Sequence, residues 1–142
     1  LKETFQELYY QKVALEGMIL KPNMVISGKK AANRARPEQV AEATLRCLKR
    51  HVPSAVPGIA FLSGGQSSPD ATLHLSLMNK LGPLPWQLTF SYGRALQDTA
   101  LKAWGGAAAT FAAGQKEFAR RAKLNGLATS GQYAAAMESQ AA

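Results

Sequence analysis

The feature that most constrains the fold of this chain is a pattern that occurs three times along it. A short, continuously apolar segment is followed by a polar loop or turn and then by a segment with helical periodicity. The apolar segments are residues 17–20, 59–62 and 86–90, and the helical segments that follow them are residues 37–50, 69–80 and 96 onward. Strands that alternate with helices form parallel sheets, and strands covered on both faces are continuously apolar. The sequence therefore predicts a parallel α/β fold with strands covered on both faces.

The number of strands limits how much of such a fold the chain can build. Residues 3–14 and 109–125 predict two further helices, and residues 126–142 are small, polar and predicted to be a mobile C-terminal tail. Only three strands are visible, whereas a closed eight-stranded barrel needs about 250 residues. The chain also begins LKETFQELYY, without an initiating Met. We therefore expect one domain over residues 1–142 that is part of a barrel and begins inside a longer protein.

Charge and composition narrow the class of partner. The 17 basic and 9 acidic residues give a net charge of +8, which favours a phosphate-bearing partner, either nucleic acid or a small anionic metabolite. The basic residues spread from Lys2 to Lys123 without a basic tail, so we expect no nucleic acid. No apolar run approaches the ~20 residues that cross a bilayer, so we expect no membrane. A single cysteine, Cys47, cannot form an internal disulfide and fits a reducing cytoplasm.

The loops after the second and third strands carry residues suited to binding an anion. Ser63, Gly64 and Gly65 follow the second strand, where consecutive glycines let backbone N–H groups converge beside a helix N-terminus. Gly93 and Arg94 follow the third strand, and a guanidinium binds phosphate bidentately. Taken singly, the glycines could form only a tight turn and the arginine a solvated helix start. Together they favour a phosphate site, because barrel enzymes place such sites on the loops after their last two strands.

Lys21 stands at the end of the first strand, directly before a proline. A lysine at a strand end most often extends its amine into water. The alternative is a lysine held in a partly apolar site near other cations, where its amine is neutral often enough to attack a carbonyl. A lysine that faces a phosphate site would meet a phosphorylated ketone or aldehyde. The sharper hypothesis is therefore Schiff-base chemistry at Lys21.

The remaining candidates favour structural roles. His51 and His74 lack partners at metal-ligand spacing, so we expect structural or surface roles and no metal site. Cys47 lies on the apolar face of its helix and is predicted to be in the core. A cluster of four cations in the last helix is predicted to be a solvated face: Lys116, Arg120, Arg121 and Lys123.

Several long segments resemble one family in colinear order over nearly the whole chain. The segments LEGMILKPNMV, GIAFLSGGQS, PWQLTFSYGRALQ and LKAWGG are similar to class I fructose-1,6-bisphosphate aldolase, the metal-independent Schiff-base type. The resemblance implies the C-terminal part of a (β/α)₈ barrel, with its last three strands. It also implies a cytoplasmic glycolytic lyase, or a plastid one in a photosynthetic eukaryote, that needs no cofactor, acts on sugar phosphates and forms a homotetramer.

The resemblance assigns roles to individual residues. Lys21 is implied to be the Schiff-base lysine, which condenses with the ketone of fructose 1,6-bisphosphate so that cleavage gives glyceraldehyde 3-phosphate and dihydroxyacetone phosphate. The site for the phosphate next to the ketone is implied to comprise these residues: Ser63, Gly64, Gly65, Ser91, Gly93 and Arg94, with Leu62 beside them.

The chain also departs from the family pattern. The family's acid/base carboxylates and its further active-site lysine lie on earlier strands that these 142 residues do not include, so we expect the chain alone to lack full activity. Many members end in a tyrosine, whereas this chain ends MESQAA, and Tyr133 is not in the matching position. Two alternatives stay open: a non-catalytic remnant that binds phosphates or a protein partner, and a basic nucleic-acid binder.

Overall fold

The computed structural model describes residues 1–139 and alternates helices with strands. The strands are β1 (Ile19–Leu20), β2 (Gly58–Phe61) and β3 (Gln87–Phe90). The α-helices are α1 (Lys2–Tyr10), α2 (Pro37–His51), α3 (Ser68–Lys80), α4 (Arg94–Trp104) and α5 (Phe111–Thr129). Three short 3₁₀ turns are η1 (Leu15–Gly17), η2 (Ala108–Thr110) and η3 (Ala135–Glu138). In the described part of the chain, no helix combines the length and apolarity that a membrane crossing requires.

The three strands form one parallel sheet in the order β1-β2-β3, which confirms the predicted parallel α/β fold. Leu20 pairs with Ile59, and Ile59 in turn pairs with Leu88, so the strands are in register across the sheet. The pairing extends past β1, because the N–H of Leu62 donates to the carbonyl of Pro22 at 3.1 Å. A proline can accept this bond although it cannot donate one, which is why the strand ends there.

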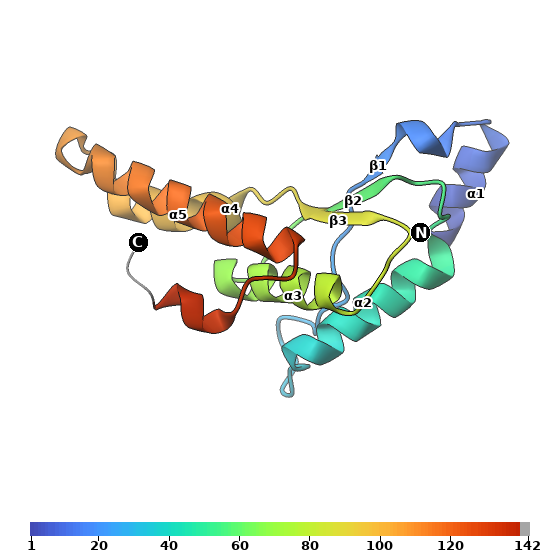
Figure 1. Cartoon of the computed structure of the whole chain (residues 1–142), viewed down its shortest axis with the longest axis horizontal. Helices are drawn as coiled ribbons and strands as arrows, with labels where there is room; N and C mark the ends of the chain where they lie inside the picture. The colour runs from blue at the N-terminus through green and yellow to red at the C-terminus, as the bar shows by residue number, and fades with distance from the viewer. Residues whose placement is uncertain (140–142) are drawn as a thin grey trace.

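Within residues 1–139, helices cover one face of the sheet. Figure 1 shows α2 and α3 along one side of the sheet, where they share a core with Ile59 and Phe61, both fully buried. Side chains alternate between faces along a strand, so the opposite face carries Ile19 and Gln87. Ile19 is 59% exposed and Gln87 is exposed as well. The prediction of strands covered on both faces is therefore wrong for the described residues, because Ile19 and Gln87 are exposed on the second face.

The helix boundaries follow local chemistry. Ser67 caps α3, since its hydroxyl accepts a hydrogen bond from the N–H of Asp70 at 3.1 Å. Ala71, Leu75 and Met78 lie on the inner side of this helix, and all three are fully buried. Helix α1 ends at Tyr10, earlier than predicted. Cys47 is half-buried on α2, so its predicted place in the core is met only in part.

A buried ion pair joins α5 to the segment that follows it. Arg121 is 2% exposed and donates to both carboxylate oxygens of Glu138, at 2.8 and 2.7 Å. The hydroxyl of Tyr133 donates to the same carboxylate at 2.6 Å, and Tyr133 is itself fully buried. The predicted solvated face is therefore wrong for Arg121. Helical spacing turns this side chain toward α3, where Thr72 lies 3.3 Å from the guanidinium.

The cluster of Arg121, Tyr133 and Glu138 also bears on the predicted tail. Helix α5 continues to Thr129, four residues past its predicted end at residue 125, and η3 follows at Ala135–Glu138. The hydroxyl of Ser76 donates to the carbonyl of Tyr133 at 2.9 Å, which links this segment to α3. The mobility of residues 126–142 in solution stays a prediction, and residues 140–142 lie outside the described range.

Acid should weaken the attachment of this segment. Burial alone raises the pKa of Glu138, but hydrogen bonds from Arg121 and Tyr133 and the charges of both arginines outweigh it, so the pKa lies below its ordinary value of 4.5. A carboxyl with a lowered folded-state pKa stabilises fully above its unfolded-state pKa and loses that contribution as the pH falls through the folded value. We therefore expect the free energy of unfolding in urea to drop as the pH falls below the ordinary pKa of 4.5 and through the lower folded-state pKa. Glu138→Gln should flatten this pH dependence, and an unchanged slope would contradict the assignment.

Candidate active site

The sheet brings the three predicted strand ends to one edge. In a parallel sheet the carboxyl ends of all strands lie on the same side. Lys21 follows β1 directly, Ser63 lies two residues after β2, and Ser91 follows β3 directly. Backbone hydrogen bonds hold these ends together, because the N–H of Leu62 reaches the carbonyl of Pro22 and the N–H of Ser91 reaches the carbonyl of Phe61 at 2.8 Å. The predicted site residues are thus adjacent in space, from three separate parts of the chain.

Gly64 is in close contact with the loop that carries Lys21. Its φ of +59° is left-handed, and a Cβ placed on it would lie 2.1 Å from the side-chain oxygen of Asn23. Asn23 in turn accepts a hydrogen bond from the N–H of Met24 at 2.9 Å, which fixes its amide. Gly65 is left-handed as well, with a φ of +83°. Only glycine fits here, because the backbone must both turn and approach Asn23 closely.

Replacing Gly64 with alanine should therefore separate the two loops. We expect Gly64→Ala to lower the free energy of unfolding by about 2–3 kcal/mol, since it combines left-handed strain with a steric clash against a fixed side chain. Urea unfolding measures this loss. Gly28→Ala is the matched control, because a Cβ at Gly28 meets nothing within 4 Å. The double variant with Asn23→Gly should recover the steric part of the loss, and no recovery would contradict the proposed clash.

A buried tyrosine anchors the loop after β3 to helix α3. Tyr92 is 5% exposed, and its hydroxyl donates to the carbonyl of Ala71 at 2.8 Å. Burial raises the pKa of Tyr92, so the hydroxyl stays protonated as the donor. Its neighbour Gly93 is the N-cap of α4 and Arg94 is its first residue, and both are exposed. Tyr92 thus anchors the loop to α3, and Arg94 lies exposed at the edge of the site.

The environment of Lys21 differs from the one predicted. The lysine is exposed, and so is Ile19, two residues before it. The expected partly apolar surroundings are therefore absent from the described residues, because Lys21 lies on the side of the sheet that no helix covers. Ser63 is buried, by contrast, at 8% exposure.

Two residues of this edge were missed by sequence reasoning. Asn23 lies in the segment LEGMILKPNMV and Gln66 in the segment GIAFLSGGQS, and the sequence alone assigns no role to either residue. Gln66 is half-buried, and its side-chain N–H donates to the carbonyl of Ser63 at 2.8 Å. Neither residue is charged or nucleophilic. The one sequence signal for a role in the site is therefore that each lies near a predicted site residue.

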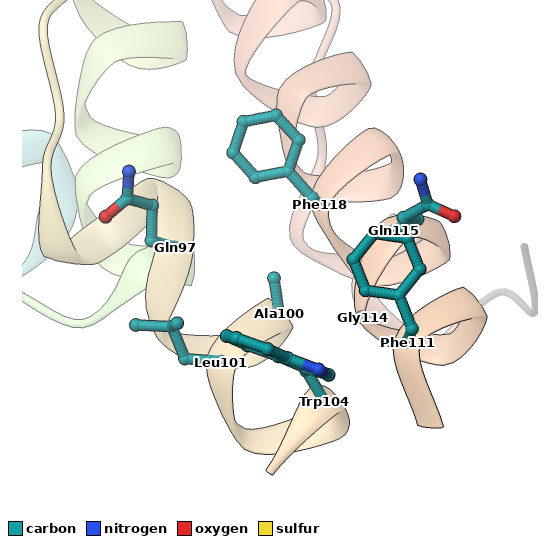
Figure 2. Close-up of a pocket in the computed structure, with 8 residues that line it drawn as sticks. All are labelled: Gln97, Ala100, Leu101, Trp104, Phe111, Gly114, Gln115 and Phe118. Atoms are coloured by element: carbon teal, nitrogen blue, oxygen red, sulfur yellow. The ribbon is translucent and has the colours of Figure 1, made fainter. Parts of the chain in front are cut away.

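Several hollows lie on the described part of the chain, and one of them borders the sheet edge. A cleft of about 340 Å³ borders the loop of residues 63–66, called the glycine-rich loop below, on the side of α3. Lys29, Arg34 and His74 contribute to its lining. A second, apolar groove of about 550 Å³ lies between α4 and α5 and contains none of the predicted site residues. Figure 2 shows Trp104 from α4 and Phe111 and Phe118 from α5 facing the space between the two helices.

Comparisons with known proteins point to one family. The family model described as "Fructose-bisphosphate aldolase class-I" matches residues 1–142. The muscle-type fructose-bisphosphate aldolase of Lethenteron camtschaticum is 58% identical over 94% of this chain and 37% of its own length. A probable class 1 aldolase of Xanthomonas axonopodis pv. citri is 52% identical over 94% of the chain and 40% of its own length.

A solved structure gives the same result for the fold. The fructose-bisphosphate aldolase of Plasmodium falciparum, solved in complex with TRAP and a small-molecule inhibitor, superposes with a TM-score of 0.91 at 45% identity. The match covers 94% of this chain and 38% of that chain. The chain thus spans about two fifths of the length of the relatives it matches.

Proposed function

Because this chain belongs to the class I fructose-bisphosphate aldolase family, we propose that it supplies the Schiff-base lysine and a phosphate site of that enzyme. The observation that supports this most directly is the sheet order. Lys21, the Ser63 loop and the loop before Arg94 each follow one of three consecutive parallel strands, at one edge of the sheet. This arrangement would let an amine and a phosphate site act on the same small molecule.

Lys21 is proposed as the nucleophile. Its neutral amine adds to the ketone of fructose 1,6-bisphosphate, and loss of water leaves a protonated iminium. A base removes the proton of the C4 hydroxyl, and the electrons of the C3–C4 bond then flow into the iminium, which releases glyceraldehyde 3-phosphate and leaves an enamine on the lysine. Protonation and hydrolysis of the enamine give dihydroxyacetone phosphate and return the amine.

The phosphate next to the ketone is proposed to lie between the loops after β2 and β3. The Ser63 hydroxyl and the N–H groups of Gly64 and Gly65 would donate to it from one side. Ser91, Gly93 and Arg94 would approach it from the other. Donors from two loops can surround the three terminal oxygens of a phosphate, which a single loop cannot do as fully.

The open face of the sheet supports a larger assembly. Ile19 and Lys21 are exposed on it, and the chain spans only about two fifths of its relatives' length. We propose that β1, β2 and β3 are the last three strands of the family's barrel and that the rest of the barrel covers this face. Such a cover would provide the apolar surroundings that a neutral lysine requires. A cytoplasmic or plastid homotetramer belongs to the same proposal.

A chimera tests the proposed function. This chain replaces the matching segment of the Xanthomonas relative, with which it shares 52% identity. We expect the chimera to cleave fructose 1,6-bisphosphate and to keep that activity in EDTA. A chimera that folds, as judged by circular dichroism and gel filtration, but neither cleaves the substrate nor forms an imine would contradict the proposal. That outcome would favour the non-catalytic remnant.

Arg94 should contribute affinity for the phosphate and not for the ketone. In the chimera, Arg94→Gln removes a charge-assisted hydrogen bond worth about 1.5–3 kcal/mol, so the KM for fructose 1,6-bisphosphate should rise about 10- to 100-fold. Steady-state kinetics measure this change. Lys102→Gln is the matched control, because Lys102 is an exposed cation on the same helix. Equal effects of the two substitutions would indicate a general loss of charge and would contradict a specific contact.

A further inference from the structure

Two hydrogen bonds from Gln66 to Ser63 fix the conformation of the glycine-rich loop. Its backbone N–H donates to the carbonyl of Ser63 at 3.0 Å, and its side-chain N–H donates to the same carbonyl at 2.8 Å. One carbonyl oxygen therefore accepts two hydrogen bonds from one residue, one for each of its lone pairs. The Ser63 carbonyl is held toward Gln66 as a result.

The direction of this carbonyl fixes the direction of a neighbouring N–H. The peptide unit between Ser63 and Gly64 is planar, and its C=O and N–H point in opposite directions. While the carbonyl points toward Gln66, the N–H of Gly64 points away from it. The N–H of Gly64 is one of the donors proposed for the substrate phosphate, so the side chain of Gln66 controls how that donor is aimed.

His74 holds the side chain of Gln66 in turn. The Nδ1 atom of His74 lies 2.6 Å from the side-chain oxygen of Gln66. That oxygen can only accept, because the amide nitrogen of the same side chain is the donor to Ser63. Nδ1 of His74 must therefore carry a proton, and it does so in the neutral Nδ1–H tautomer as well as in the charged ring.

The surroundings keep this ring fixed and uncharged. His74 is 7% exposed on α3, between Leu73 and the fully buried Leu75. Burial lowers the pKa of His74, although the carboxylates of Asp70 and Glu38 raise it in part. The neutral ring is thus the form present near pH 7, and its one N–H is committed to Gln66.

We propose that His74, acting through Gln66, is a positioning residue that aims the Ser63–Gly64 loop and so sets the affinity of the site for phosphate. The proposal rests on the proposed function of that loop. His74 touches no substrate in this scheme, since it lies on the helix side of the loop. Its effect reaches the site through two successive hydrogen bonds.

Paired substitutions separate the hydrogen bond from the packing of the ring. His74→Phe keeps the ring and loses the donor. His74→Asn loses the ring and keeps a donor, because Nδ2 of asparagine is one bond from Cγ, as Nδ1 is in histidine. Gln66→Glu keeps the acceptor for His74 and loses the donor to Ser63. His51→Phe is the matched control, because His51 is exposed at the end of α2 and bonds only to the carbonyl of Cys47.

The chain itself, labelled with ¹⁵N, is titrated with inorganic phosphate while the amide signals of Gly64 and Gly65 are followed. We expect His74→Phe and Gln66→Glu to weaken phosphate binding about five- to tenfold, the loss of one hydrogen bond. His74→Asn should restore most of the affinity, and His51→Phe should change nothing. Hydrogen exchange of the Gln66 amide should speed up in His74→Phe and not in His74→Asn.

Each alternative result overturns the proposal in its own way. If His74→Phe and His74→Asn weaken binding equally, the ring acts through packing and not as a donor. If the Gly64 and Gly65 amides do not respond to phosphate even in the unsubstituted chain, the loop is not a phosphate site. Imine formation with dihydroxyacetone, which has no phosphate, is measured in parallel. The presence or absence of this imine reports on the proposed Schiff-base function, separately from the hydrogen bonds that run from His74 through Gln66 to Ser63.

Discussion

Lys21→Met should abolish imine formation on this chain. Methionine matches the length of lysine but carries no amine, so no bond to a ketone can form at this position. With dihydroxyacetone phosphate and borohydride, we expect the unsubstituted chain, joined to the rest of the barrel in the chimera, to gain a stable adduct on Lys21, located by peptide mass mapping. In the chimera, the kcat for cleavage of fructose 1,6-bisphosphate should fall by a factor on the order of 10⁴ or more, as for removal of a covalent nucleophile elsewhere.

The control for this experiment is a nearby lysine. The side chain of Lys29 reaches the glycine-rich loop, and a Cβ on Gly65 would lie 3.3 Å from its amine. Lys29→Met should therefore leave the Lys21 adduct in place. An adduct that is spread over several lysines, or that is equally strong in Lys21→Met, would show nonspecific amine chemistry and would refute the assignment of Lys21.

Arg121→Met should cause the largest loss of stability. The substitution removes the cation that pairs with the carboxylate of Glu138. The hydroxyl of Tyr133, which donates to the same carboxylate, is then the partner that remains. Breaking a buried ion pair from one side costs about 3–5 kcal/mol, and the lower end applies because Glu138 keeps 21% of its side-chain exposure. For a chain of this size, we expect a fall in Tm of about 10 °C in a thermal melt.

Two further variants test whether the lost charge is the cause. Lys123→Met removes an exposed cation from the same helix and should change the Tm by no more than about 1 °C. Adding Glu138→Gln to Arg121→Met should recover part of the loss, since the unpaired carboxylate is then gone. If the double variant is as unstable as the sum of the two single ones, the ion pair is not the source of the stability.

The elements that the sequence predicts well are those with a local signal. The strand–loop–helix pattern predicts the parallel sheet and the helix over residues 69–80, because hydrophobic period depends on neighbours in the chain. The adjacency of Lys21 and the Ser63 loop follows from the sheet order and was also predictable. Their roles as nucleophile and phosphate site stay predictions.

The features that the sequence predicts poorly depend on distant contacts. Arg121 belongs to the same cluster of cations as the exposed Lys123, and the return of the chain at Tyr133 and Glu138 provides its buried partners. The contact between Asn23 and Gly64 joins residues 41 positions apart, by the difference of their numbers. The hydrogen bonds from His74 through Gln66 to Ser63 are equally hard to predict from the sequence, because an isolated histidine on a helix gives no sign of its partner.

The two outer strands of the sheet have a consequence for the handling of this chain. In the described residues, β1 and β3 each pair with β2 alone, so each leaves one row of backbone N–H and C=O groups without a strand beside it. Such rows are templates on which another copy of a chain can add a strand, and closure into a barrel removes them. The apolar Ile19 stands beside one of these rows, 59% exposed. Barrel closure would thus protect the chain against self-aggregation as well as complete its site.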